Sequence, residues 1–208
     1  MTDAGGLAPW ERKSAQAHAD CRVYRIVREQ WTSVGHAAEG EFFVMEVGDW
    51  AVAVALTEAG RCVLVRQFRF GSGEFSWELP AGVVDAGEDP VAGALRELYE
   101  ESGYRGGRAR VLGVVHPNPA VQRNRCHIVL VTGARRAGAG DPGPHEFFEV
   151  REVPLETLFA WARDGTITHS IVHTALFFLR DAPEAADPSA LEPEGGRGQT
   201  GGQAEAGG

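Results

Sequence analysis

The sequence predicts an α/β domain in which helices cover a mixed sheet, with an N-terminal strand arm before it and a disordered tail after it. The main observation is the order of the patterns: strands come first, then one central helix, more strands and terminal helices. That order is typical of a layered α/β or α+β domain. A chain of 208 residues, 43% of them hydrophobic, can also bury one sizeable core.

The N-terminal part is predicted to be a flexible segment over residues 1–20, followed by an arm of strands over 21–47. The segments CRVYRIVREQWTSV and EFFVMEV in this arm each show partial alternation of apolar and polar residues. The domain itself is predicted over 48–181. Its first two strands, WAVAVALT and RCVLVRQFRF, flank a TEAG turn, which indicates a hairpin.

The clearest element is a helix from Asp89 to Ser102. Asp89 suits the N-cap, Pro90 suits the first helical position, and Gly103 follows the last helical residue. The apolar residues of this segment fall on one stripe that can face a core. They are Val91, Ala94, Leu95 and Leu98.

The rest of the chain continues the mixed pattern. Strands are predicted at RVLGVV, CHIVLVTG and FFEVREV, and helices at LETLFAWARDG and ITHSIVHTALFFLRD. Residues 182–208 are rich in Pro, Glu, Gly and Ala and offer little apolar surface to bury, so they are predicted to be a disordered tail.

The charge balance limits the classes of partner. A net charge of −9 argues against a general nucleic-acid binder, and an anionic substrate would bind only where cations or arginines reverse the local field. The three cysteines, Cys21, Cys62 and Cys126, form neither a disulfide pattern nor a zinc pattern. The N-terminus lacks the apolar core of a signal peptide, and no apolar run approaches the length of about 20 residues that a membrane span needs. We therefore expect a cytoplasmic protein with no membrane partner.

Three carboxylates gather on the central helix. Glu97, Glu100 and Glu101 stand at i, i+3 and i+4 and share one face. Such a group is more often a solvated acidic face balanced by a neighbour such as Arg96. Here Gly82 and other loop glycines precede the helix and let backbone carbonyls approach an ion. Clustered carboxylates repel one another unless a cation lies among them, and the spacing suits a hard divalent ion such as Mg²⁺.

Residues 82–104 match the Nudix box, G-x5-E-x7-R-E-U-x-E-E-x-G-U, where U is a bulky aliphatic residue. Only the last position departs from it, because Tyr104 stands in place of an aliphatic residue. The sequence is therefore similar to the Nudix hydrolases. The matching residues are Gly82, Glu88, Arg96, Glu97, Leu98, Glu100, Glu101 and Gly103.

This resemblance implies an α/β/α sandwich with a loop–helix–loop site for Mg²⁺ or Mn²⁺. It implies that Glu97 and Glu101 are the main metal ligands, with Glu100 assisting and the carbonyl of Ala81 added from the loop. Arg96 would orient the carboxylates, and Glu88 would support the network. The cations would neutralise the diphosphate and activate a water molecule.

Features outside the box resemble the ADP-ribose and nucleoside diphosphate sugar pyrophosphatases. These features are QFR at 67–69, ELPAG at 78–82, Pro119, and HPNPAVQRNRCH at 116–127. The resemblance implies that Arg69 and Glu78 bind substrate, although Arg69 could equally be an exposed strand-end arginine. It also implies a homodimer paired through the N-terminal arm.

A general base from a mobile loop is also implied by this branch. Glu146, in the segment PHEFFEV, is the candidate, with Glu149 as the alternative; the other interpretation of Glu146 is an acid at a strand edge.

The expected activity is Mg²⁺-dependent hydrolysis of ADP-ribose or a nucleoside diphosphate sugar to a nucleoside monophosphate and a sugar phosphate. One alternative is a dinucleoside polyphosphate or RNA 5′-end pyrophosphohydrolase, which the acidic composition makes less attractive for RNA. Another is a Nudix-like module that senses nucleotide sugars without catalysis, although this box keeps all its acidic residues. Other residues are expected to be structural: Trp77 and Phe68 as core or dimer contacts, and His169 and His173 as helix surface.

Overall fold

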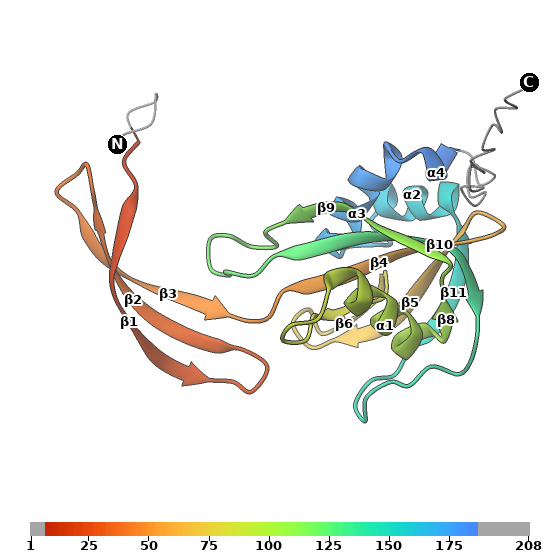
Figure 1. The fold of residues 1–208 in the computed structure, drawn as a ribbon, viewed down its shortest axis with the longest axis horizontal. Coiled ribbons are helices and arrows are strands. Elements are labelled where there is room, and N and C mark those ends of the chain that lie inside the picture. Colours follow the sequence, from red (N-terminus) through yellow and green to blue (C-terminus); the bar gives the residue numbers. More distant parts are fainter. Residues whose placement is uncertain (1–6, 187–208) are drawn as a thin grey trace, which may run out of the picture.

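The structure is a computed structural model that describes residues 7–186 of the chain. It contains two sheets. Three antiparallel strands form the smaller one, which projects from the rest of the molecule at the left of Figure 1. These strands are β1 (Trp10–Asp20), β2 (Arg25–Ser33) and β3 (Glu39–Glu46). We call this sheet the arm.

The larger sheet has eight strands, and its central path runs in the order β11-β5-β4-β10-β8. It is a mixed sheet, because β10 lies parallel to β4 while the other paired strands are antiparallel. Its strands are β4 (Trp50–Thr57), β5 (Arg61–Arg69), β6 (Glu74–Glu78), β7 (Ala81–Val83), β8 (Tyr104–Arg105), β9 (Arg108–Val115), β10 (Cys126–Arg136) and β11 (Glu149–Pro154).

Helices cover both faces of this sheet, as Figure 1 shows. On one face lies α1, and on the other lie α2 and α3 with the short α4 beside them. The described helices are α1 (Pro90–Ser102), α2 (Leu155–Asp164), α3 (Ser170–Arg180) and α4 (Pro183–Ala186). The expected α/β/α sandwich is therefore confirmed.

Strand β4 explains why the sheet is buried on both sides. Its even-numbered residues, such as Val52 and Val54, pack in the core shared with α2 and α3. Its odd-numbered residues, such as Ala51 and Ala53, pack in the core shared with α1. A strand that buries both faces reads as a continuous apolar run, which is the pattern WAVAVALT in the sequence.

The predicted central helix is confirmed with its caps. The Asp89 carboxylate accepts hydrogen bonds from the backbone N–H groups of Val91 and Ala92, at 2.9 and 3.2 Å. Gly103 ends the helix in the left-handed region with φ of 74°. A side chain there would be strained, which is why glycine follows the last turn.

The N-terminal expectation differs from the structure. Residues 1–20 were expected to be flexible, whereas Trp10–Asp20 forms β1 and pairs with β2 along its length. All eleven side chains of β1 are exposed, so the strand carries no alternation of buried and exposed positions. Backbone hydrogen bonds hold it, and the arm therefore begins before residue 21. Part of the predicted tail is ordered, because Ala182 is buried in the core and Pro183–Ala186 forms α4; residues 187–208 of that prediction lie outside the described residues.

In residues 7–186, no helix combines the length and the apolar character needed to cross a membrane.

Candidate functional site

We define the acidic edge of α1 as Glu97, Glu100 and Glu101, and Arg96 contacts the first two of them. The guanidinium donates hydrogen bonds to Glu97 at 2.7 Å and to Glu100 at 2.9 Å. It also donates hydrogen bonds to Glu88 from two nitrogens, at 3.0 and 3.1 Å. These bonds to Glu88 are the main reason that the pKa of Arg96 is raised. Arg96 thus partly balances the carboxylates of Glu88, Glu97 and Glu100, and it links the loop before α1 to the helix.

Glu101 is the most deeply placed of these acids, with 8% of the residue exposed. Its carboxylate accepts a hydrogen bond from the N–H of Ala81 at 3.0 Å. Burial raises the pKa of Glu101 well above its ordinary value, and the negative charges of Glu97 and Glu146 raise it further. Burial also raises the pKa of Glu97. A bound cation would stabilise the ionised form of both groups.

Gly82 allows β7 to lie directly against the Glu97 carboxylate. A Cβ atom at this position would lie 2.1 Å from Oε1 of Glu97, which is far inside van der Waals contact. The backbone next to Ala81 therefore borders the acidic edge, where the resemblance expects a carbonyl ligand.

These residues fit a divalent cation by their chemistry. Among the described residues, no three Asp, Glu, His or Cys side chains already converge as a complete metal site. Glu97 and Glu100 are turned towards Arg96, and Glu101 towards the Ala81 amide. Carboxylates beside a close backbone are nevertheless the donors that Mg²⁺ prefers, and Mg²⁺ keeps waters and substrate phosphates as its other ligands.

Arg69, the last residue of β5, and Glu78, the last residue of β6, form a two-pronged ion pair. The donor–acceptor distances are 2.9 Å from Nε to Oε1 and 2.6 Å from Nη2 to Oε2. Glu78 is almost fully buried, whereas 41% of the Arg69 side chain is exposed. The hydrogen bonds that Arg69 donates to Glu78 are the main reason that the pKa of Arg69 is raised. Arg69 is therefore a held guanidinium with an accessible side and not a free strand-end arginine.

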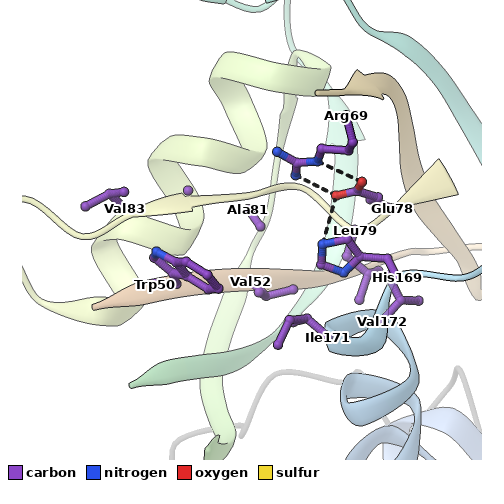
Figure 2. Close-up of a pocket in the computed structure, with 11 residues that line it drawn as sticks. Trp50, Val52, Arg69, Glu78, Leu79, Ala81, Val83, His169, Ile171 and Val172 are labelled. Carbon is purple, nitrogen blue, oxygen red and sulfur yellow. Dashed lines mark hydrogen bonds and ion pairs between the residues drawn. The ribbon is translucent and has the colours of Figure 1, made fainter. Parts of the chain in front are cut away.

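A cavity of about 360 Å³ lies next to this ion pair (Figure 2). Its polar end is formed by Arg69, Glu78 and His169. Ala81 and Gly82 also line it, so the cavity and the acidic edge share strand β7. The main apolar lining residues are Trp50, Val52, Leu79, Val83, Ile171 and Val172.

The two candidate bases occupy different surroundings. Glu146 lies in the loop before β11 and accepts a hydrogen bond from the N–H of Gly143 at 2.8 Å. Its charge acts on Glu97, Glu101 and Arg69, so it lies within electrostatic reach of both the acidic edge and the cavity. Glu149 instead pairs with Arg66 of the neighbouring strand β5, at 3.4 Å, and with Arg151 of its own strand, at 2.6 Å.

Among the cavity residues that sequence reasoning missed, two carry ring systems. His169 was expected on the helix surface, but it precedes α3 and points into the cavity (Figure 2). Trp50, the first residue of β4, forms part of the opposite wall. No local signal marks either one, because sheet pairing and helix packing bring them together. His173 is exposed as expected, and Trp77 is buried in the core, where its ring lies 5.8 Å from that of Trp161.

The fold and the acidic edge of α1 together define a class of protein. A family model matches the same part of the chain. Residues 49–172 match the NUDIX domain, and because this covers more than half of the chain, the protein belongs to the Nudix family.

Among its relatives, the chain is 40% identical over 102 residues to an ADP-sugar pyrophosphatase of Mus musculus, covering 46% of each chain. It is 37% identical over 112 residues to an ADP-ribose pyrophosphatase of Bacillus subtilis (strain 168), covering 51% of this chain and 58% of that one. The chain thus spans about half the length of these curated relatives. A solved structure described as an ADP compounds hydrolase shares the fold, with a TM-score of 0.73 at 18% identity over 84% of this chain and 94% of that chain.

Proposed function

We propose that this protein hydrolyses the diphosphate linkage of ADP-ribose or a nucleoside diphosphate sugar, with Mg²⁺ or Mn²⁺ as cofactor. The products would be a nucleoside monophosphate and a sugar phosphate. One observation carries the proposal: the acidic edge of α1 and the Arg69–Glu78 cavity both border strand β7, at Ala81 and Gly82. A substrate with a diphosphate and an attached ring needs such a pair of neighbouring sites. The matched relatives named for ADP-sugar and ADP-ribose hydrolysis support the choice of substrate class.

Glu97, Glu100 and Glu101, with the carbonyl of Ala81, would hold the metal. When bound, the metal would neutralise the diphosphate and lower the pKa of a water molecule. Arg96 would position the carboxylates, because it contacts Glu97 and Glu100 directly.

Arg69 and Glu78 would bind the substrate. Glu78 fixes the guanidinium through two hydrogen bonds, and the exposed side of Arg69 can donate to an anionic or polar group. In an acidic protein this held cation would help to attract the diphosphate.

Glu146 would act as the general base that accepts a proton from the attacking water. Its loop position and its electrostatic reach to Glu97 and Glu101 favour it over Glu149, whose carboxylate pairs with Arg66 and Arg151. Glu146→Gln should therefore lower kcat, with a smaller effect from Glu149→Gln.

The test is product release from ADP-ribose and a panel of nucleotide sugars, with and without Mg²⁺. We expect a nucleoside monophosphate and a sugar phosphate only when the metal is present, and loss of most activity in Glu101→Gln with the fold retained. Dinucleoside polyphosphates and 5′-triphosphorylated RNA complete the panel. Turnover of those alone would reassign the substrate class, and binding without hydrolysis would favour a sensing module.

We also propose that the arm mediates a homodimer. The arm carries an apolar groove, in which Trp10 and Phe42 are each more than 40% exposed. The residues that line the groove are Trp10, Trp31, Phe42, Val44 and Ala120. Apolar patches of this kind are typical of protein interfaces. Light scattering should give the mass of a dimer, and Phe42→Asp should shift it to a monomer. A monomeric mass for the wild type would contradict the proposal.

A cytoplasmic location remains part of the proposal. Cys21, Cys62 and Cys126 are free thiols, which a reducing compartment preserves. Cell fractionation with an antibody against the chain tests it.

A further inference from the structure

His169 stands at the N-cap of α3 without capping it. The residue has the extended backbone of an N-cap, with φ of −70° and ψ of 115°, but its side chain makes no capping hydrogen bond. Ser, Thr, Asp and Asn stabilise helices at this position and histidine does not. The imidazole instead lines the cavity beside Arg69 and Glu78 (Figure 2).

The two ring nitrogens of His169 have different surroundings. Nε2 lies 3.6 Å from Oε2 of Glu78. Nδ1 is buried and has no hydrogen-bond partner. Buried polar atoms are nearly always hydrogen-bonded in native proteins, so an unpaired nitrogen in a residue that lines a cavity points to a missing partner.

The chemistry of Glu78 assigns the proton. An ionised carboxylate only accepts hydrogen bonds, so the nitrogen that faces it carries the hydrogen, and Nδ1 then presents a lone pair. Burial is the main reason that the pKa of His169 lies below its ordinary value, which favours the neutral ring. Nδ1 is therefore an acceptor whose donor lies outside the described part of the chain.

We propose that His169 contacts the substrate, with Nδ1 accepting a hydrogen bond from a hydroxyl or amino group on the moiety attached to the diphosphate. The inference rests on the proposed function and adds a specificity-determining residue to it. The cavity volume of about 360 Å³ suits one ring system, and Trp50 offers an aromatic face to that ring. Because Ala81 and Gly82 belong to both sites, a ring in the cavity can remain joined to a diphosphate at the acidic edge.

A competing role for His169 is to hold Glu78, and two polar variants separate the roles. The amide of asparagine falls near the position of Nδ1, and the longer glutamine reaches the position of Nε2. His169→Asn keeps a polar atom for a ligand, whereas His169→Gln keeps one for Glu78.

The experiment measures kcat and KM for ADP-ribose hydrolysis with saturating Mg²⁺. We expect His169→Leu and His169→Gln to raise KM about tenfold, the effect of one lost hydrogen bond, with kcat changed less than twofold. His169→Asn should restore KM. Thr174→Ala, which changes a hydroxyl on the same helix that bonds the Ser170 carbonyl, is the matched control and should leave both constants unchanged. Melting temperatures of all variants identify any that fail to fold.

An unchanged KM in His169→Leu would overturn the inference, and so would rescue by glutamine without rescue by asparagine. Parallel assays with ADP-glucose and UDP-glucose locate the donor. If the rise in KM depends on which sugar the substrate carries, the donor to Nδ1 is a hydroxyl of the sugar. If it depends on which nucleoside the substrate carries, the donor is the amino group.

Failure of the proposed function would be seen separately. If the wild type hydrolyses no nucleotide sugar, calorimetric binding of ADP-ribose to the wild type and to His169→Leu still tests the contact. Weaker binding by the variant would support it. Equal binding, or no binding by the wild type, would overturn it.

Discussion

Gly82 is the residue on which the two halves of the candidate site depend most directly. It lies on β7 and lines the cavity. Because it has no side chain, it leaves space for the Glu97 carboxylate that the Cβ atom of any other residue would fill. The requirement is steric: the ideal Cβ position overlaps both carboxylate oxygens, at 2.1 and 2.5 Å. A side chain at residue 82 would have to displace a candidate metal ligand.

Gly82→Ala should therefore lower kcat about a hundredfold while leaving the circular dichroism spectrum unchanged, since a displacement of about 1 Å in a catalytic group has this effect. Gly71→Ala is the matched control, because its added methyl group meets nothing within 4 Å. Steady-state kinetics of both variants checks the prediction. Equal activity in the two would contradict the placement of Glu97.

At the scale of residues, sequence spacing was informative where function depends on a local register. Arg96, Glu97, Glu100 and Glu101 share one helix, so their proximity follows from helical geometry alone. His169 and Trp50 could not be found in that way. They come from α3 and β4, and only tertiary packing places both at one cavity.

Among the elements, the arm contains a buried acid that links it to the large domain. Glu29 is fully buried and accepts hydrogen bonds from Arg12 of β1 and Arg123 of the loop before β10, both at 2.7 Å. Trp31 donates a third, at 3.0 Å. Burial alone would raise the pKa of Glu29, but these hydrogen bonds and charges outweigh it and lower the pKa. Glu29 thus fastens the arm to the large domain.

The lowered pKa fixes the sign of a pH dependence. A carboxylate whose pKa is lower in the folded state stabilises that state above its unfolded value, here near 4.5, and loses this contribution as the pH falls through the folded value. Glu29→Gln should therefore lose hydrogen-exchange protection in β1 and β2 at pH 7. The difference from the wild type should shrink below pH of about 4.5.

The matched control is Glu41→Gln, which alters a more exposed acid on β3 of the same sheet. It should change protection little at either pH. A Glu29→Gln variant with wild-type protection at pH 7 would show that Glu29 does not hold the arm.

Elements differed in how well the sequence predicts them. The α1 helix was predictable because its caps, its apolar stripe and its final glycine agree. Strand β1 was not, since all its side chains face solvent and its order comes from pairing with β2. The pattern of apolar and polar residues therefore does not predict such a strand.

For the whole molecule, the central feature is the mixed sheet with a core on each face. Its parallel pair, β4 with β10, joins residues more than seventy positions apart. The sequence predicts both strands from their apolar runs but not their pairing, because side-chain alternation does not specify a distant partner. This pairing forms the part of the sheet against which the cavity and α1 lie.

The core shared with α2 and α3 should protect its two cysteines from thiol reagents. Cys62 and Cys126 are buried, and burial raises the pKa of each thiol to about 12, whereas Cys21 is exposed. At pH 8 one thiol should react with Ellman's reagent in the native protein, and all three after unfolding in guanidinium chloride. Rapid reaction of a second thiol in the native state would show that a core is open to solvent.

The central claim is that the acidic edge of α1 holds a divalent cation, and direct Mn²⁺ binding tests it most simply. Electron paramagnetic resonance counts free Mn²⁺ in a titration of the wild type, Glu101→Gln and the control Glu156→Gln, which changes an exposed acid in the first turn of α2. We predict Mn²⁺ binding by the wild type and the control, and at least tenfold weaker binding by Glu101→Gln. Equal binding by all three proteins would contradict the account.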